Sequence, residues 1–136
     1  MKWSKRRVSV LENKCKRLLA VEQVPFEDLE KGKGKQLPQE AGIYVLYEDG
    51  EVAYVGITKG SLRRRIYKNH FRGSKRNSAF RKTLMRQKRF RAKNPVRKYM
   101  LNHMEVAWKK MDSEEAEILE HFMIAVLNPA YNGGKK

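Results

Sequence analysis

Glu120 is the residue whose position most clearly suggests chemistry. It lies in a segment whose apolar residues, among them Leu119, Met123 and Leu127, recur at helical spacing. At about 100° per residue, Glu120 projects into the apolar arc rather than onto the polar side. A carboxylate directed toward a buried face needs a partner or a metal, and carboxylate oxygen is a hard donor suited to Mg²⁺ or Mn²⁺. Two interpretations are open, a buried ion pair with an arginine and a divalent metal site.

Two tyrosines, Tyr44 and Tyr54, lie in segments that are typical of a β-hairpin. Residues 42–47 and 52–57 are rich in β-branched and aromatic side chains and flank an acidic turn that contains Gly50. A two-residue loop would put the two phenol groups on opposite faces. A three-residue loop, with Gly50 as a bulge, places Tyr44 directly opposite Tyr54. We favour the three-residue loop because it also keeps two glutamates of the turn from facing each other.

In this register the two faces of the hairpin differ. One face shows the two tyrosines with Gly42 opposite Gly56, and bare glycine backbone would leave a shallow patch that a ligand could approach closely. The other face is apolar and is expected to join the core through Ile43, Val45, Ala53, Val55 and Ile57.

Side chains that cap helices mark three predicted helix starts. Ser61 and Ser78 precede two basic segments, and Asp112 precedes a last helix that Pro129 ends. Near the beginning of the chain, apolar residues between positions 4 and 20 recur at spacings of three and four, which predicts an amphipathic helix.

Two further segments have less pronounced patterns. Residues 86–98 show little apolar periodicity around Pro95 and are expected to form a loop. Residues 101–108 alternate, with Met104, Val106 and Trp108 on one side, which predicts a third strand.

Positive charge is concentrated in one part of the chain. The net charge is +16, and residues 52–104 hold 17 Lys and Arg without a single Asp or Glu, whereas the remainder holds 14 basic and 15 acidic residues. Such a field should attract a polyanion; the alternative is a solvated surface that promotes solubility. Membrane phosphates fit less well, because a strong apolar face opposite the lysines is lacking.

Several classes of protein are excluded by composition. No stretch approaches the roughly 18 to 20 apolar residues of a membrane span, and charged residues follow the basic residues 1–7, so no signal peptide is expected. The single Cys15 excludes an intrachain disulfide framework and a multi-cysteine zinc site. The chain is predicted to be soluble and cytoplasmic, with one main domain.

The tripeptides Gly42-Ile43-Tyr44 and Tyr54-Val55-Gly56 resemble the two signature tripeptides of the GIY-YIG nuclease family. The resemblance covers residues 38–132 and continues in three later segments, which are Leu62–Ile66, Leu119–Glu120 and Pro129–Asn132. It implies an α+β domain with a small three-stranded antiparallel sheet flanked by helices. It also implies a metal-dependent endonuclease that hydrolyses DNA phosphodiester bonds.

The resemblance also implies roles for individual residues. Glu120 would hold a single Mg²⁺ or Mn²⁺, and Arg65 would bind the phosphate with its bidentate fork. Tyr44 would be the general base or an orienter of the attacking water, and Tyr54 would donate a hydrogen bond to the scissile phosphate or share in activating water. Asn132 would orient a substrate or hold the C-terminal segment.

The sequence departs from the family pattern in two places. The segment before Leu62 is one residue longer than usual, so Arg64 competes with Arg65; we prefer Arg65 for its spacing from Leu62. The family often has a histidine four residues after the arginine, but Asn69 stands there and His70 follows, which leaves the catalytic role of His70 open.

The predicted partner is DNA, with RNA not excluded, no membrane and an unknown oligomeric state. The alternative function is a non-catalytic, basic nucleic-acid-binding module on the same fold. The predicted organisation is an N-terminal helical extension and linker (1–37), a nuclease domain (38–132) and a tail (133–136). The expected nucleic-acid contacts are basic residues of the central segment: Arg63, Arg64, Lys68, Arg72, Lys75, Arg76, Arg81 and Lys82.

Overall fold

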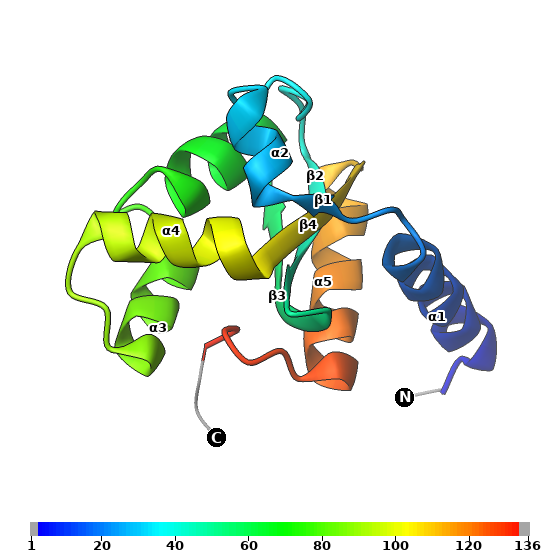
Figure 1. Cartoon of the computed structure of the whole chain (residues 1–136). Helices are drawn as coiled ribbons and strands as arrows, with labels where there is room; N and C mark the ends of the chain where they lie inside the picture. The colour runs from blue at the N-terminus through cyan, green and yellow to red at the C-terminus, as the bar shows by residue number, and fades with distance from the viewer. Residues whose placement is uncertain (1–2, 134–136) are drawn as a thin grey trace.

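A four-stranded antiparallel sheet forms the centre of the fold in the computed structural model, which describes residues 3–133. The strands lie in the order β1-β4-β2-β3 (Figure 1). The predicted α+β class is confirmed, but the predicted number of three strands was wrong. The additional strand, β1, consists of two residues paired with β4, which are too few to show an alternating pattern in the sequence. The strands are β1 Val24–Pro25, β2 Gly42–Glu48, β3 Glu51–Thr58 and β4 Met104–Lys110.

Helices cover both faces of the sheet (Figure 1). One face lies under α2 (Phe26–Lys31), the π-helix η1 (Arg63–Phe71), α3 (Ala79–Lys88) and α4 (Lys93–His103). The other face lies under α1 (Lys5–Leu19) and α5 (Ser113–Leu127). Of the predicted tail, residues 134–136 lie outside the described residues.

The β2–β3 hairpin has a two-residue loop and a β-bulge, so the predicted three-residue loop was wrong. Glu48 pairs with Glu51, and both loop residues have positive φ, 48° and 85°, as in the turns that match strand twist. The bulge inserts Ala53, after which Leu46 pairs with Tyr54. Ala53 therefore lies on the tyrosine side of the sheet rather than on the predicted apolar face.

The bulge keeps the two tyrosines on one face although the loop has the length expected to separate them. Tyr44 lies opposite Gly56 instead of Tyr54, and Gly42 lies opposite Thr58 instead of Gly56. Because one inserted residue shifts the alternation of the strand by one position, Tyr44 and Tyr54 become diagonal neighbours on the same side.

A helix, α4, occupies most of the segment 86–98 that was predicted to be a loop. Pro95 lies in its first turn, where the backbone N–H groups have no partner within the helix and proline is tolerated. Val96 and Met100, four residues apart, are its buried positions. The helix continues to His103, so the predicted strand begins only at Met104.

The helix starts predicted from capping residues are confirmed. Ser61, Ser78 and Asp112 each accept hydrogen bonds from backbone N–H groups of the following turn. The amphipathic helix near the beginning of the chain is also confirmed: α1 buries Cys15 and Leu18 against α5 and β4. Within residues 3–133, no helix is both long and apolar enough to cross a membrane.

Candidate active site

Tyr44 is buried under the helices rather than displayed on an open patch. Its side chain is 1% exposed, and its hydroxyl lies 2.5 Å from Nε2 of His70, which is also 1% exposed. Gly56 makes this position possible, because a Cβ there would collide with the phenol ring tip. The predicted shallow patch was therefore wrong: the glycine admits the ring of Tyr44 and not a ligand.

The π-helical form of η1 explains why His70 reaches Tyr44. In a π-helix the backbone bonds join residues five apart, as in the 3.0 Å bond from the Arg72 N–H to the Tyr67 carbonyl. Residue i+5 then occupies the place that residue i+4 takes in an α-helix. His70, five residues after Arg65, thus stands where the family pattern expects a histidine four residues later.

Ser78 connects this pair to α3. Its Oγ lies 2.6 Å from Nδ1 of His70 and accepts the backbone N–H of Arg81 at 3.0 Å. Ser78 is therefore both the N-cap of α3 and the second partner of the imidazole. Sequence reasoning identified the cap but missed the contact with His70, and a serine eight positions beyond a histidine gives no periodic signal that could have revealed it.

Tyr54, on the edge strand β3, lies next to the buried pair of Tyr44 and His70. Its ring centroid is 6.2 Å from that of Tyr44 and 5.4 Å from that of Phe80 on α3. Unlike Tyr44 it is only partly buried. β3 is the edge strand, so Tyr54 is the phenol that remains accessible from outside.

The C-terminal segment pairs with the free edge of β3 next to Tyr54. The side-chain amide of Asn132 accepts the N–H of Val55 and donates to its carbonyl, both at 2.8 Å, and the N–H of Tyr131 donates to the Ala53 carbonyl at 2.9 Å. Of the two roles expected for Asn132, the structure shows the holding of this segment. Its amide is used by the backbone of β3.

Arg65 and Glu120 both act electrostatically on the tyrosine pair. Burial is the largest effect and raises the pKa of Tyr44 and of Tyr54 above the ordinary value. Arg65 lowers the pKa of each phenol and Glu120 raises it, so both charges lie within range of both rings. Arg64 is exposed and has no such effect, which favours Arg65 as the arginine of the site.

His70 is held in its neutral form. Burial, together with the positive charges of Arg65 and Arg81, lowers the pKa of His70 to about 3. No carboxylate contacts the ring within the described part of the chain, since its two nitrogens face Tyr44 and Ser78.

The carboxylate of Glu120 suits a divalent metal. Burial raises the pKa of Glu120, while His121 lowers it and Glu117 raises it. No hydrogen bond or ion pair of this side chain is found among residues 3–133, so the expected alternative, a salt bridge to an arginine, is absent there. No group of three or more His, Cys, Asp and Glu that could hold a metal occurs in the same residues, so water and substrate oxygens would complete the shell around one carboxylate.

Arg81 is not available for the nucleic-acid contact predicted for it. It is 0% exposed, and its guanidinium donates to the carbonyls of His70 and Phe71 at 3.1 and 2.6 Å. Burial and, to a smaller extent, the charge of Arg97 lower the pKa of Arg81 to about 10. Arg81 is a structural residue that joins η1 to α3. No feature of the sequence indicated this role, because Arg81 stands among other lysines and arginines that are exposed.

The other predicted contacts remain at least partly accessible. Arg63 donates to the carbonyls of Lys35 and Leu37, and Arg72 forms an ion pair of 3.0 Å with Glu30, so these two also fasten neighbouring segments. The remaining predicted contacts are exposed: Arg64, Lys68, Lys75, Arg76 and Lys82.

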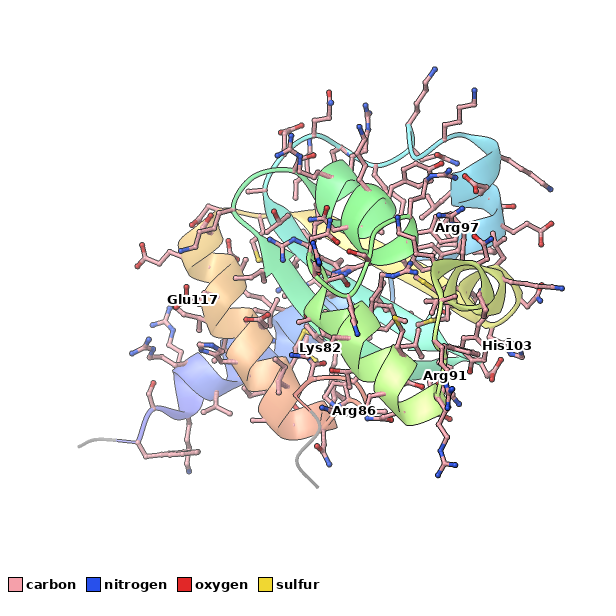
Figure 2. All side chains as sticks on the ribbon, turned by 90° about the vertical axis from the view of Figure 1, so that its left-hand side faces the viewer. Lys82, Arg86, Arg91, Arg97, His103 and Glu117 are labelled. Carbon is pink, nitrogen blue, oxygen red and sulfur yellow. The ribbon has the colours of Figure 1, made fainter. Side chains whose placement is uncertain are left out.

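Two clefts of the described structure have basic walls. One, of about 760 Å³, lies between the end of β3 and the start of η1, and its cationic walls are Lys59, Arg63, Arg64, Arg65 and Lys68. The other, of about 790 Å³, follows α3, where Figure 2 shows Lys82, Arg86 and Arg91 along one side of the molecule. No acidic residue lines either cleft. Arg65 lines the first cleft, but Tyr44, Tyr54 and Glu120 are not among the lining residues of either one.

The antiparallel sheet with two tyrosines on one face, backed by a histidine and flanked by an arginine and a glutamate, has the architecture of a GIY-YIG nuclease domain. A family model described as "GIY-YIG catalytic domain" matches residues 24–135. The chain belongs to the GIY-YIG family, as its tripeptides suggested.

Two solved structures are similar to this chain at low identity. Both are crystal structures of the GIY-YIG N-terminal endonuclease domain of UvrC from Thermotoga maritima, each a tyrosine-to-phenylalanine point mutant bound to its catalytic divalent cation. One is 23% identical with a TM-score of 0.46 and the other 22% identical with a TM-score of 0.43; each match covers 75% of this chain and 92% of the solved chain. No curated protein matches the chain significantly.

Proposed function

We propose that this chain is a metal-dependent endonuclease that hydrolyses DNA phosphodiester bonds. The observation that carries the proposal is the arrangement around Tyr54: a partly exposed phenol, backed by the buried Tyr44–His70 pair, within the fields of Arg65 and of the unpaired Glu120 carboxylate. A module that only binds nucleic acid has no use for a carboxylate that faces the phosphate site.

Arg65 and a metal ion held by Glu120 would both compensate the negative charge that develops on the phosphate during hydrolysis. Hydrolysis builds negative charge on the phosphate oxygens, and the guanidinium of Arg65 would bind them in bidentate fashion. Glu120 would hold Mg²⁺ or Mn²⁺, which supplies Lewis-acid stabilisation of that charge.

Tyr54 takes the water-orienting role expected of Tyr44. Tyr44 is 1% exposed and so does not touch the attacking water, whereas Tyr54 is accessible at the sheet edge. Burial raises the pKa of both phenols, so a neutral phenol that orients water fits this site better than a free phenolate base. Tyr44 and His70 then act behind Tyr54, through the hydroxyl of Tyr44.

Duplex or branched DNA is proposed as the polyanion because both basic clefts are free of acidic side chains. Contacts of this kind bind the phosphate backbone with little choice of sequence. RNA is less favoured, since stacking on unpaired bases needs exposed aromatics and the cleft beside Arg65 has none. The cytoplasmic location stays a prediction.

The test is cleavage of supercoiled plasmid by the full chain with Mg²⁺, with Mn²⁺ and with chelator. We expect nicking that needs the metal, and a loss of at least about 100-fold in Glu120→Gln, as for removal of one group that stabilises the transition state. Glu114→Gln is the matched control, because Glu114 is an exposed glutamate on the same helix. Salt-sensitive binding without cleavage in any metal would instead establish the non-catalytic module.

A further inference from the structure

The α3 cleft, the one of about 790 Å³, has an apolar patch between its basic walls. Two apolar side chains, Met85 and Phe90, line it together with five cations, which are Lys75, Arg76, Lys82, Arg86 and Arg91. Met85 and Phe90 are partly buried and pack on the hydrophobic core, so their remaining surface is available in the cleft. The cleft therefore presents two kinds of surface, one suited to negative charge and one suited to an apolar group.

The turn that ends α3 places Phe90 beside Met85. Arg89 has a left-handed φ of 59°, and the N–H of Phe90 donates to the carbonyl of Met85 at 2.9 Å. This bond is that of a Schellman turn, which often brings apolar side chains at these two positions into contact. The main chain therefore fixes the place of Phe90 in the cleft.

The five cations of the α3 cleft have no acidic partner. None of them forms an ion pair within residues 3–133, and no acidic residue lines the cleft. They come from the loop before α3, from α3 itself and from the segment after it; Figure 2 shows Lys82, Arg86 and Arg91 on one side of the molecule. Like charges gathered in one place attract an anion. An anion that also has an apolar body would use the whole lining.

The cleft beside Arg65 differs in its apolar lining. The two clefts have nearly equal volumes, about 760 and about 790 Å³, and each has five cations. Among the described residues that line the first cleft, Ile57 is the only one with a large apolar side chain, and none is aromatic. The first cleft therefore suits a sugar–phosphate backbone, whereas the α3 cleft also suits a base, since every base has a face that packs on an aromatic ring.

The helix α3 carries both this cleft and a contact with Tyr54. The ring centroid of Phe80, in the first turn of α3, lies 5.4 Å from that of Tyr54. Met85 follows about 7.5 Å further along the helix axis, at a rise of about 1.5 Å per residue. A DNA strand bound at Tyr54 can therefore extend into the α3 cleft.

We propose that the α3 cleft binds an unpaired nucleotide of DNA, with the base on Met85 and Phe90 and its phosphates on the surrounding cations. The choice of DNA rests on the proposed nuclease function. Within a duplex the bases stack on one another, so only an unpaired nucleotide presents a free face. The proposal narrows the substrate to DNA in which a duplex adjoins a single strand, selected by structure, because base–aromatic packing tolerates any sequence.

The test is binding of three DNAs by the full chain, measured by fluorescence anisotropy in chelator. One DNA is a blunt duplex, the second adds a short single-stranded overhang, and the third adds an overhang of abasic nucleotides. The two overhangs have the same phosphates, so the difference between their affinities measures the bases alone. We expect the natural overhang to bind about 5- to 100-fold more tightly than the abasic one, the factor that one base packed on an aromatic ring contributes. Equal affinities overturn the proposal.

Substitutions of Phe90 locate the bound base. Phe90→Ala should remove most of the advantage of the natural overhang, whereas Phe90→Tyr, which keeps the ring, should retain it. Phe90→Leu preserves an apolar contact with Met85 without a ring, and it replaces the alanine variant if that variant fails to fold. Each result is a ratio of two affinities of one variant, so a general loss of folded protein cancels.

Val10→Ala is the matched control, because Val10 is an exposed apolar residue of α1, on the other face of the sheet. Loss of the advantage in this control, or its full retention in Phe90→Ala and Phe90→Leu, places the base elsewhere and overturns the proposal. An RNA overhang that binds more tightly than the DNA overhang also overturns it, because the unpaired strand would then be RNA. A chain that prefers the natural DNA overhang but cuts no DNA in any metal supports this inference and contradicts the proposed function.

Discussion

At the scale of single residues, His70 makes the stability of the fold depend on pH. Its folded pKa of about 3 lies below that of an unfolded histidine, about 6.5. Between these values the unfolded chain binds more protons, so the free energy of unfolding falls as the pH is lowered, by up to about 1.4 kcal/mol per pH unit.

We expect His70→Gln to show a smaller loss of unfolding free energy than the native chain between about pH 6.5 and pH 4. Urea denaturation across this range measures it. His121→Gln is the control, because His121 is exposed. Equal pH dependence of the native chain and His70→Gln would show that His70 is not held neutral in the fold.

Glu120 is a residue at which function and stability oppose each other. Burial raises its pKa, so above its ordinary pKa the folded state holds a proton more tightly than the unfolded state, and stability is lost as the pH rises through the raised value. We expect Glu120→Gln to unfold at the same or a higher temperature than the native chain at neutral pH. Mg²⁺ at a hundred times its Kd should stabilise the native chain by about 2.7 kcal/mol and leave the variant unchanged. Equal stabilisation by the metal would remove Glu120 from the site.

At the scale of elements, the π-helix η1 accommodates one residue more than an α-helix would need. Arg65 and His70 face the tyrosines from successive turns although five positions separate them. Deletion of Asn69 would restore a spacing of four, so we expect the variant to form an α-helix here and to keep metal-dependent cleavage. Circular dichroism and the plasmid assay test both expectations.

Deletion of Arg64 is the contrasting variant. It leaves the spacing from Arg65 to His70 unchanged but moves Arg65 one position closer to the Ser61 cap, so cleavage should be lost. If the Asn69 deletion is instead the inactive one, π-helical spacing is required for the site rather than tolerated.

Elements with local signals were predictable, and those fixed by distant contacts were not. The starts of three helices were predictable from Ser61, Ser78 and Asp112, because a capping residue contacts backbone within the next turn. The bulge at Ala53 has no local signal; the C-terminal segment, far along the chain, binds its carbonyl. For the site, the resemblance to the family supplied the tyrosines, Arg65 and Glu120, and spacing supported the pairing of the tyrosines and the inward projection of Glu120, but the contact of His70 with Ser78 depends on how η1 packs on α3.

At the scale of the whole molecule, both faces of the sheet carry a hydrophobic core, but the basic segment 52–104 supplies helices to only one of them. The helices η1 and α3 carry the basic segment over the tyrosine face, whereas α1 and α5 close the opposite face. Glu120 belongs to α5, which packs on the edge strand β3, and its carboxylate acts electrostatically on both tyrosines. The site therefore forms where the two layers meet, and neither layer carries it alone.

Two adjacent basic residues test this division between binding surface and core. Lys82 is exposed beside the α3 cleft, so Lys82→Ala should lower the slope of log K against log salt for DNA by about 1, with little change in unfolding free energy. Arg81→Met should leave the slope unchanged and cost about 1–3 kcal/mol for each carbonyl left without a donor, those of His70 and Phe71 among them. Fluorescence anisotropy at several salt concentrations and urea denaturation measure the two effects. A reduced salt slope in Arg81→Met without loss of stability would mean that this guanidinium binds phosphate after all, and that α3 opens when DNA binds.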